Sequence, residues 1–450
     1  MKGGYANFKH LQLIGLLIPL IVTVVIETTF IKTYDLVEKF FLPIQEKIVL
    51  FSLLTFFILI LQYFILRYLN KILNIKLTKQ INSNLYYRVS IFSIIILGIL
   101  FGLLIYQMFF FNYYNTSIVI LIIILIYGLA SFFMLRLSLL FFSWYKSKPT
   151  LINFFYFVSM SLIVFNLIMT TTITTIKISE RPYEIREFVG GSIDISVGRY
   201  ITLDTIYKIS SLMSFVSLWI TTLILLYRYK NNLLHTLVFI LILSLPLIYF
   251  LISYSYEFIF GKLLGTFLMN DPITISIILT VLLSLSKPIG GLTFGFAFWR
   301  IAKTIGYEKT IKIHMIISGW GILLLFGTNQ ASNQVLVPYP PFGLATITVL
   351  ILASYMMFLG IYNSARLVSV NLTLRKTIRK HTLESNLLES IGQAEMENEI
   401  RKTVNSIIQD KDIIKIPIDT NLEFDKKELR KYIDSVINEV KHERNNKDNS

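Results

Sequence analysis

The sequence predicts an all-α integral membrane protein with about ten transmembrane helices, a small outer β-hairpin loop and a cytoplasmic helical tail. Three observations support this prediction. Of the 450 residues, 54% are hydrophobic and 15% are charged, and the mean hydropathy of +0.66 exceeds that of soluble globular proteins. Apolar stretches of roughly 20 residues, the length that a helix needs to cross a bilayer, recur up to residue 365. Basic residues gather in alternate loops between these stretches.

The apolar stretches follow one another from the beginning of the chain. They are residues 11–31, 47–67, 89–110, 117–140, 151–176, 202–226, 233–256, 273–298, 311–327 and 342–365. The first stretch is long and is followed by further spans, so we interpret it as a membrane helix and not as a cleaved signal peptide. The chain therefore divides into a transmembrane domain, residues 1–365, and a tail, residues 366–450.

Loop charge predicts the orientation of the spans. The connection at 67–88 contains five cations and no acid, and the connections at 141–150, 227–232 and 299–312 also carry lysine and arginine. The loops between them are acidic, mixed or uncharged. Because lysine and arginine concentrate in cytoplasmic loops, this alternation predicts a multi-pass protein of the cell membrane with both termini in the cytoplasm. It also accounts for the net charge of +15 without nucleic acid as a partner.

The largest outer loop contains a hairpin pattern, YEIREFVGGSIDISVGRY. Apolar residues alternate with other residues on both sides of Gly190 and Gly191. They are Tyr183 and Ile185 before the glycines, and Ile193, Ile195 and Val197 after them. Such alternation around two glycines predicts two strands joined by a tight turn. The hairpin is either an ordered cap over the outer helix ends or a ligand-sensing surface.

The tail has the composition of a soluble segment. It begins with five cations that directly follow the last span, so we expect them to contact anionic lipid headgroups. These cations are Arg366, Arg375, Lys376, Arg379 and Lys380. Farther on, apolar residues at helical spacing predict two amphipathic helices, the first around Met396 to Ile407 and the second from Asp425. Membrane lipids, a cytoplasmic protein that binds the tail, or a second copy of the chain are the expected partners.

The eighth span is interrupted by a charge and by helix breakers. Lys287 lies near its middle, where a charge costs about 2.5 kcal/mol or more unless it faces a partner or water. Pro288 removes a backbone donor, and Gly290 and Gly291 permit close packing or unwinding. Broken helices of this kind line binding sites in many transporters. Alternatively, the segment kinks or ends early, and Lys287 pairs with a carboxylate or reaches the cytoplasmic interface.

Other polar residues of the spans are few. Glu27, in the first span, is the first candidate for a partner of Lys287 within the membrane. We interpret His314 and the four tryptophans, Trp144 among them, as residues of the membrane interface. Cysteine is absent, the five histidines are isolated, and no catalytic motif occurs, so we predict no catalytic, cofactor-binding or metal-binding residue.

Two segments near the end of the transmembrane domain carry a resemblance to a known family. They are VPYPPFGLATITVL, residues 337–350, and GIYNSARLVSVNLTLRKTIRK, residues 360–380. On these segments the sequence resembles a family of uncharacterised multi-spanning membrane proteins from ammonia-oxidising archaea. The resemblance implies an archaeal membrane and no particular activity.

The function predicted from these features is that of a non-enzymatic membrane protein. In the preferred interpretation it is a sensor-like or scaffold component that acts through its outer loops and its cytoplasmic helical tail. The alternative is a secondary transporter that uses the broken eighth helix around Lys287.

Overall fold

A computed structural model of the chain describes most of the predicted spans and the beginning of the tail. The described residues are 2–32, 43–74, 81–180, 182–186, 201–227, 243–251, 286–305, 309–329, 339–371, 375, 378 and 386–411. The chain forms two compact units, Met1–Glu399 and Ile400–Ser450. The first unit contains all the membrane-spanning helices described below.

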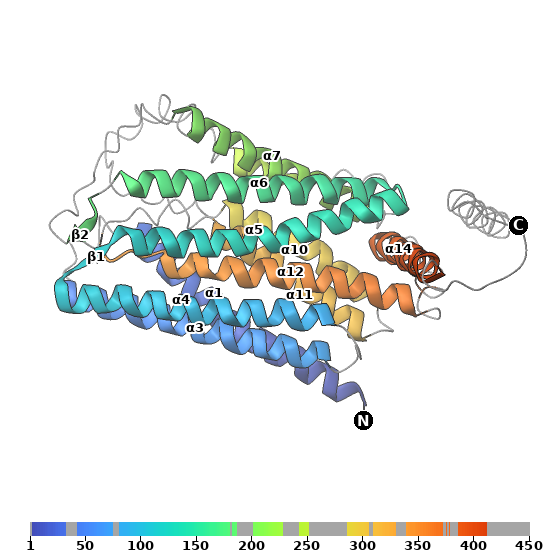
Figure 1. Ribbon diagram of the computed structural model, residues 1–450, viewed down its shortest axis with the longest axis horizontal. Helices are drawn as coiled ribbons and strands as arrows, with labels where there is room; N and C mark the ends of the chain where they lie inside the picture. Colours follow the sequence, from blue (N-terminus) through green and yellow to red (C-terminus); the bar gives the residue numbers. More distant parts are fainter. Residues whose placement is uncertain are drawn as a thin grey trace, which may run out of the picture. The chain divides into compact units, whose positions relative to one another are not determined.

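Long helices account for nearly all of the described structure (Figure 1). Their bounds are α1 Lys2–Lys32, α3 Ile44–Asn74, α4 Ile81–Phe111, α5 Thr116–Ser147, α6 Leu151–Ser179, α7 Ile201–Tyr227, α10 Ser286–Thr304, α11 Lys309–Asn329, α12 Leu344–Val370 and α14 Asn386–Lys411. Seven of them, α3, α4, α5, α6, α7, α11 and α12, are long and apolar enough to cross a membrane. The protein is thus an all-α membrane protein by length and composition of its helices.

The number of ten spans stays a prediction. In α1, the apolar stretch Gln12–Glu27 is shorter than the seven others. Residues 233–242 and 252–256 of the seventh predicted span, and residues 273–285 of the eighth, lie outside the described residues. The described parts of both spans, 243–251 and 286–298, are helical.

Two short strands close one end of the bundle (Figure 1). β1, Tyr113–Asn115, lies between α4 and α5, and β2, Glu184–Arg186, follows α6. They pair antiparallel, with Tyr114 opposite Ile185. The predicted alternation around Ile185 is therefore a strand, but the partner that the structure describes is β1. The second arm of the predicted hairpin lies within 187–200, outside the described residues.

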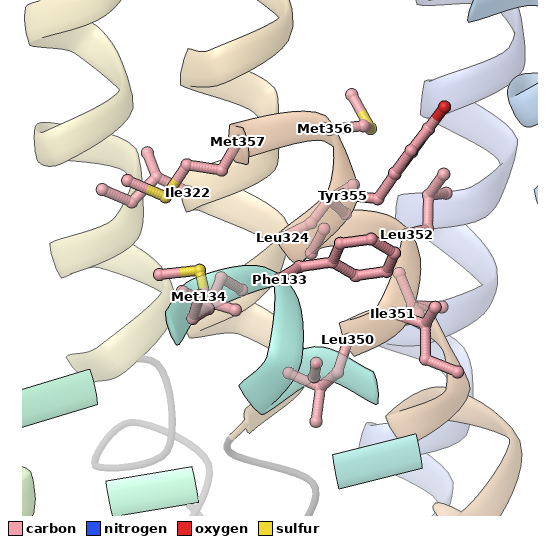
Figure 2. Close-up of a cluster of buried hydrophobic side chains, with 14 of the residues drawn as sticks. Phe133, Met134, Ile322, Leu324, Leu350, Ile351, Leu352, Tyr355, Met356 and Met357 are labelled. Atoms are coloured by element: carbon pink, nitrogen blue, oxygen red, sulfur yellow. The ribbon is translucent and has the colours of Figure 1, made fainter. Parts of the chain in front are cut away.

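α12 forms the centre of the bundle. Its most apolar 18-residue window is completely buried, because α11, α5 and α3 pack around it. Figure 2 shows Phe133 and Met134 of α5 and Ile322 and Leu324 of α11 in the core that these helices form with residues 350–357 of α12. A helix that is apolar on all sides is suited to such a position.

Glycines let α11 lie closely between α10 and α12. A Cβ atom added at Gly295 of α10 would lie 2.7 Å from the carbonyl oxygen of Gly319, and one added at Gly321 would lie 2.7 Å from the backbone nitrogen of Met357. Because Gly319 and Gly321 are two positions apart on α11, they face different neighbours. Small residues at these points allow the backbones to approach and thereby fix the three helices together.

Candidate functional site

Lys287 lies near the start of α10 and faces α7. Its side chain is 9% exposed, and Nζ lies 5.8 Å from the ring centroid of Tyr207, within the range of a cation–π interaction. The neighbouring Ser286 is also buried. Since residues 281–285 lie outside the described part of the chain, a break of the helix at Pro288 stays a prediction.

The two glycines after Lys287 serve helix packing. A Cβ atom at Gly290 would lie 2.3 Å from the ring of Phe215 on α7, and one at Gly291 would lie 2.9 Å from the Cβ of Phe326 on α11. Both positions are helical. Of the two roles that the sequence left open, close packing and unwinding, the described structure shows the first.

Glu27 has partners other than Lys287. Its buried carboxylate accepts a hydrogen bond of 2.7 Å from the backbone N–H of Gly343, and a second bond from the hydroxyl of Thr346. No ion pair joins Glu27 to Lys287, although the structure describes both side chains. The predicted pairing is therefore corrected: the carboxylate binds the N-terminus of α12.

The N-terminus of α12 explains why a carboxylate is favourable there. Gly343 is the N-cap residue, has a φ of 89° and offers no side chain to accept from the free N–H groups of the first turn. Glu27 supplies this acceptor from α1, and the positive end of the helix dipole adds to the attraction. The absence of a side-chain cap in FGLAT is the sequence signal from which a distant acceptor could have been inferred.

Of the five cations expected at lipid headgroups, the structure describes two side chains. Arg366 is half-buried near the end of α12. Arg375 is also half-buried, and its guanidinium donates to the sulfur of Met396 on α14. Arg375 thus contacts the tail helix. Lys376, Arg379 and Lys380 lie outside the described residues, and their contact with headgroups stays a prediction.

The first half of α14 docks on the turn between α5 and α6. The indole N–H of Trp144 donates to Oε2 of Glu395 at 2.7 Å, and both side chains are buried. Asn398 bonds two serines of α5: its Oδ1 accepts from the hydroxyl of Ser147 at 2.5 Å, and its Nδ2 donates to that of Ser143 at 2.9 Å. The end of α5 is therefore held by two polar side chains of the tail.

Two further bonds extend this contact into the turn itself. The ammonium of Lys148 donates to the side-chain oxygen of Gln393. The hydroxyls of Thr150 and Ser390 are 2.8 Å apart. The partners are about 240 to 255 residues apart along the chain, so local sequence could not reveal them.

An apolar face of the same helix segment is buried with these polar contacts. Leu387, Leu388 and Ile391 have no exposed surface. Gly392 lies against α12, where an added Cβ would be 2.2 Å from a methyl carbon of Val368. The tail segment up to Glu399 consequently belongs to the unit of the membrane helices, whereas composition alone had placed the boundary after residue 365.

Two residues interpreted as interfacial have different surroundings in the structure. Trp144 has no exposed surface and is covered by the tail helix. His314 is 1% exposed and lies on α11, where its backbone oxygen accepts from Ser318. Sequence reasoning missed both because a ring with an apolar body and a polar tip suits a helix contact as well as a membrane surface.

These features define the class of the protein: an all-α, multi-pass membrane protein whose tail helix is docked on the helical bundle. No protein-family model, curated protein or solved structure matches the chain. The resemblance to a family from ammonia-oxidising archaea therefore stays a prediction.

Proposed function

We propose that the protein is a sensor-like, non-enzymatic component of the cell membrane, in which α12 couples the outer end of the bundle to the docked tail. The observation that supports this most directly is the set of hydrogen bonds between α14 and the α5–α6 turn. Each such bond contributes only about 0.5–1.5 kcal/mol net. The apolar face of α14 at Leu387, Leu388 and Ile391 is buried as well, so these bonds set the position of the helix, and a modest change at another site can weaken them individually.

α12 carries a polar contact at one end and an apolar packing contact at the other. At one end, Glu27 binds Gly343 and Thr346. At the other end, Val368 packs against Gly392 of the tail helix. Because α12 is packed on all sides, a shift along its axis would alter both contacts together.

The proposed orientation places the tail in the cytoplasm. In Figure 1 the start of α1, the end of α3, the start of α4, the α5–α6 turn and the end of α12 lie at one end of the first unit, and β1 and β2 lie at the other. The former end carries the basic loops 67–88 and 141–150. With this orientation, a cytoplasmic protein or a second copy of the chain would meet the tail when it is released.

The docking contact can be tested by the reactivity of a single introduced cysteine, because the chain has none of its own. Ala394→Cys places a small thiol in the buried face of α14. We expect slow modification by a soluble maleimide in this variant. Adding Trp144→Phe or Glu395→Leu removes the buried hydrogen bond and should accelerate modification roughly fivefold, which corresponds to about 1 kcal/mol. Equal rates in all three variants would contradict docking in solution.

The coupling has its own test, so the two parts of the proposal can fail separately. Glu27→Gln, combined with Ala394→Cys, alters only the far end of α12. If α12 transmits the change, the rate of cysteine modification should differ from that of Ala394→Cys alone. An unchanged rate, together with acceleration by Trp144→Phe, would leave the docking intact and refute the sensor-like coupling, which leaves the scaffold role.

A secondary transporter is the second candidate, since a lysine is buried between α7 and α10. Ser286, the neighbour of Lys287 in the chain, is also buried, and Tyr207 of α7 lies over the ammonium. A carrier must open such a site to water. Ser286→Cys should then react with a membrane-impermeant thiol reagent, and a complete lack of reaction would argue against the carrier.

A further inference from the structure

An open pocket of about 660 Å³ lies between α1, α3 and α4, and no residue of the docked tail lines it. Its volume falls within the range of about 300–1,000 Å³ typical of small-molecule sites. The lining residues are Leu16 of α1, Phe64, Arg67, Tyr68, Asn70 and Lys71 of α3, and Tyr87 of α4. None of the described residues that line it is acidic.

The cationic part of the lining comes from one turn of α3. Arg67 and Lys71 are four residues apart, so their side chains lie next to each other on the same helix face. An arginine offers a planar pair of donors to a phosphate, and a lysine adds a mobile point charge. The two side chains together are suited to hold one anionic group.

The apolar part of the lining indicates what is attached to this group. Phe64 precedes Arg67 by three residues on the same face and is 46% exposed, on a stretch of α3 where other large apolar side chains are also exposed. Leu16 faces the same pocket from α1. A soluble anion would leave these apolar surfaces uncovered, whereas the acyl chains of a lipid would bury them.

We propose that this pocket binds the phosphate-containing headgroup of an anionic membrane lipid, with the acyl chains along Phe64 and Leu16. Arg67 and Lys71 hold the phosphate, and Tyr87 lines the pocket from α4. Basic pockets between helices at the cytoplasmic ends of spans bind lipid headgroups in this manner. The site is distinct from the cations after the last span and does not depend on the function of the tail.

Native mass spectrometry of the purified full chain in detergent can test the site. The probes are dioleoylphosphatidylglycerol, which is anionic, dioleoylphosphatidylcholine, which has the same chains and no net charge, and glycerol 3-phosphate, which has no chains. We expect phosphatidylglycerol to be retained in preference to the other two. The double variant Arg67→Gln/Lys71→Gln should weaken its binding by at least about tenfold, since each cation near a headgroup contributes about fivefold.

A matched control separates the site from general charge. Arg88→Gln/Lys146→Gln removes two exposed cations that lie outside the lining at the same end of the bundle. This variant should retain phosphatidylglycerol as the unaltered chain does. The exchange Arg67→Lys/Lys71→Arg keeps both charges and should keep most of the binding. Leu16→Trp narrows the pocket without changing its charge and should weaken the retention of phosphatidylglycerol. This variant tests the site independently if the Arg67→Gln/Lys71→Gln variant does not fold.

Several results would overturn the proposal. Equal retention of phosphatidylglycerol and phosphatidylcholine would show that the site does not recognise the negative charge of the lipid. Displacement of phosphatidylglycerol by an equal concentration of glycerol 3-phosphate would show that the site takes a soluble phosphate ester. An equal loss of binding in the Arg88→Gln/Lys146→Gln control would assign the effect to overall charge.

Discussion

At the scale of single residues, the effect of replacing Glu27 on stability can be predicted, because its carboxylate accepts hydrogen bonds from two identified donors. Glu27→Ala would leave the N–H of Gly343 and the hydroxyl of Thr346 without an acceptor in a buried place. We expect a loss of about 1–3 kcal/mol in the free energy of unfolding, and a smaller loss for Glu27→Gln, whose amide oxygen can still accept. Thermal unfolding in detergent measures the difference. Glu46→Ala, at an exposed carboxylate of α3, should change stability by no more than about 0.5 kcal/mol.

The same residue shows what sequence can and cannot reveal. An acid within an apolar run is visible at once, and its need for a partner follows from electrostatics. The partner itself could not be identified from the sequence. Gly343 is more than three hundred positions away, and it donates through a backbone N–H, which almost every residue type has. Lys287 was the expected partner because charge is conspicuous in a sequence, whereas the free N–H groups of a helix end are not.

At the scale of helices, replacing a glycine by alanine is expected to have opposite effects on stability in α10 and in α4. Gly295→Ala would place a Cβ atom 2.7 Å from the carbonyl oxygen of Gly319, so the two helices would have to separate. We expect this overpacking to destabilise the protein by about 1–3 kcal/mol. Gly102→Ala is the matched control, because no atom lies within 4 Å of the added Cβ, and alanine favours the helix by up to about 1 kcal/mol.

Unfolding of both variants in the same detergent would decide the matter. Destabilisation by Gly295→Ala and neutrality or gain in Gly102→Ala is the expected pair of results. Equal effects would mean that the approach of α10 and α11 does not contribute to stability. The sequence shows all these glycines alike, and only the packing of neighbouring helices separates those that are required from those that are not.

Element boundaries illustrate the same distinction. Eight of the predicted spans coincide with described helices, because a long apolar stretch can be recognised in the local sequence. These helices are α1, α3 to α7, α11 and α12. The central position of α12 could not be predicted, because residues 342–365 are no more apolar than the spans that face lipid. The docking of α14 could not be predicted either, since its polar partners lie on α5 and in the α5–α6 turn.

At the scale of the whole molecule, the orientation in the membrane is the remaining prediction. The basic loops place the α5–α6 turn in the cytoplasm and β1 and β2 outside. Tyr183→Cys, next to β2, and Lys146→Cys, at the end of α5, introduce thiols at exposed positions of a chain that has no cysteine. An impermeant maleimide applied to intact cells should label Tyr183→Cys and leave Lys146→Cys unlabelled, and both should react once the membrane is opened. Labelling of Lys146→Cys alone in intact cells would invert the topology and move the docked tail to the outer side.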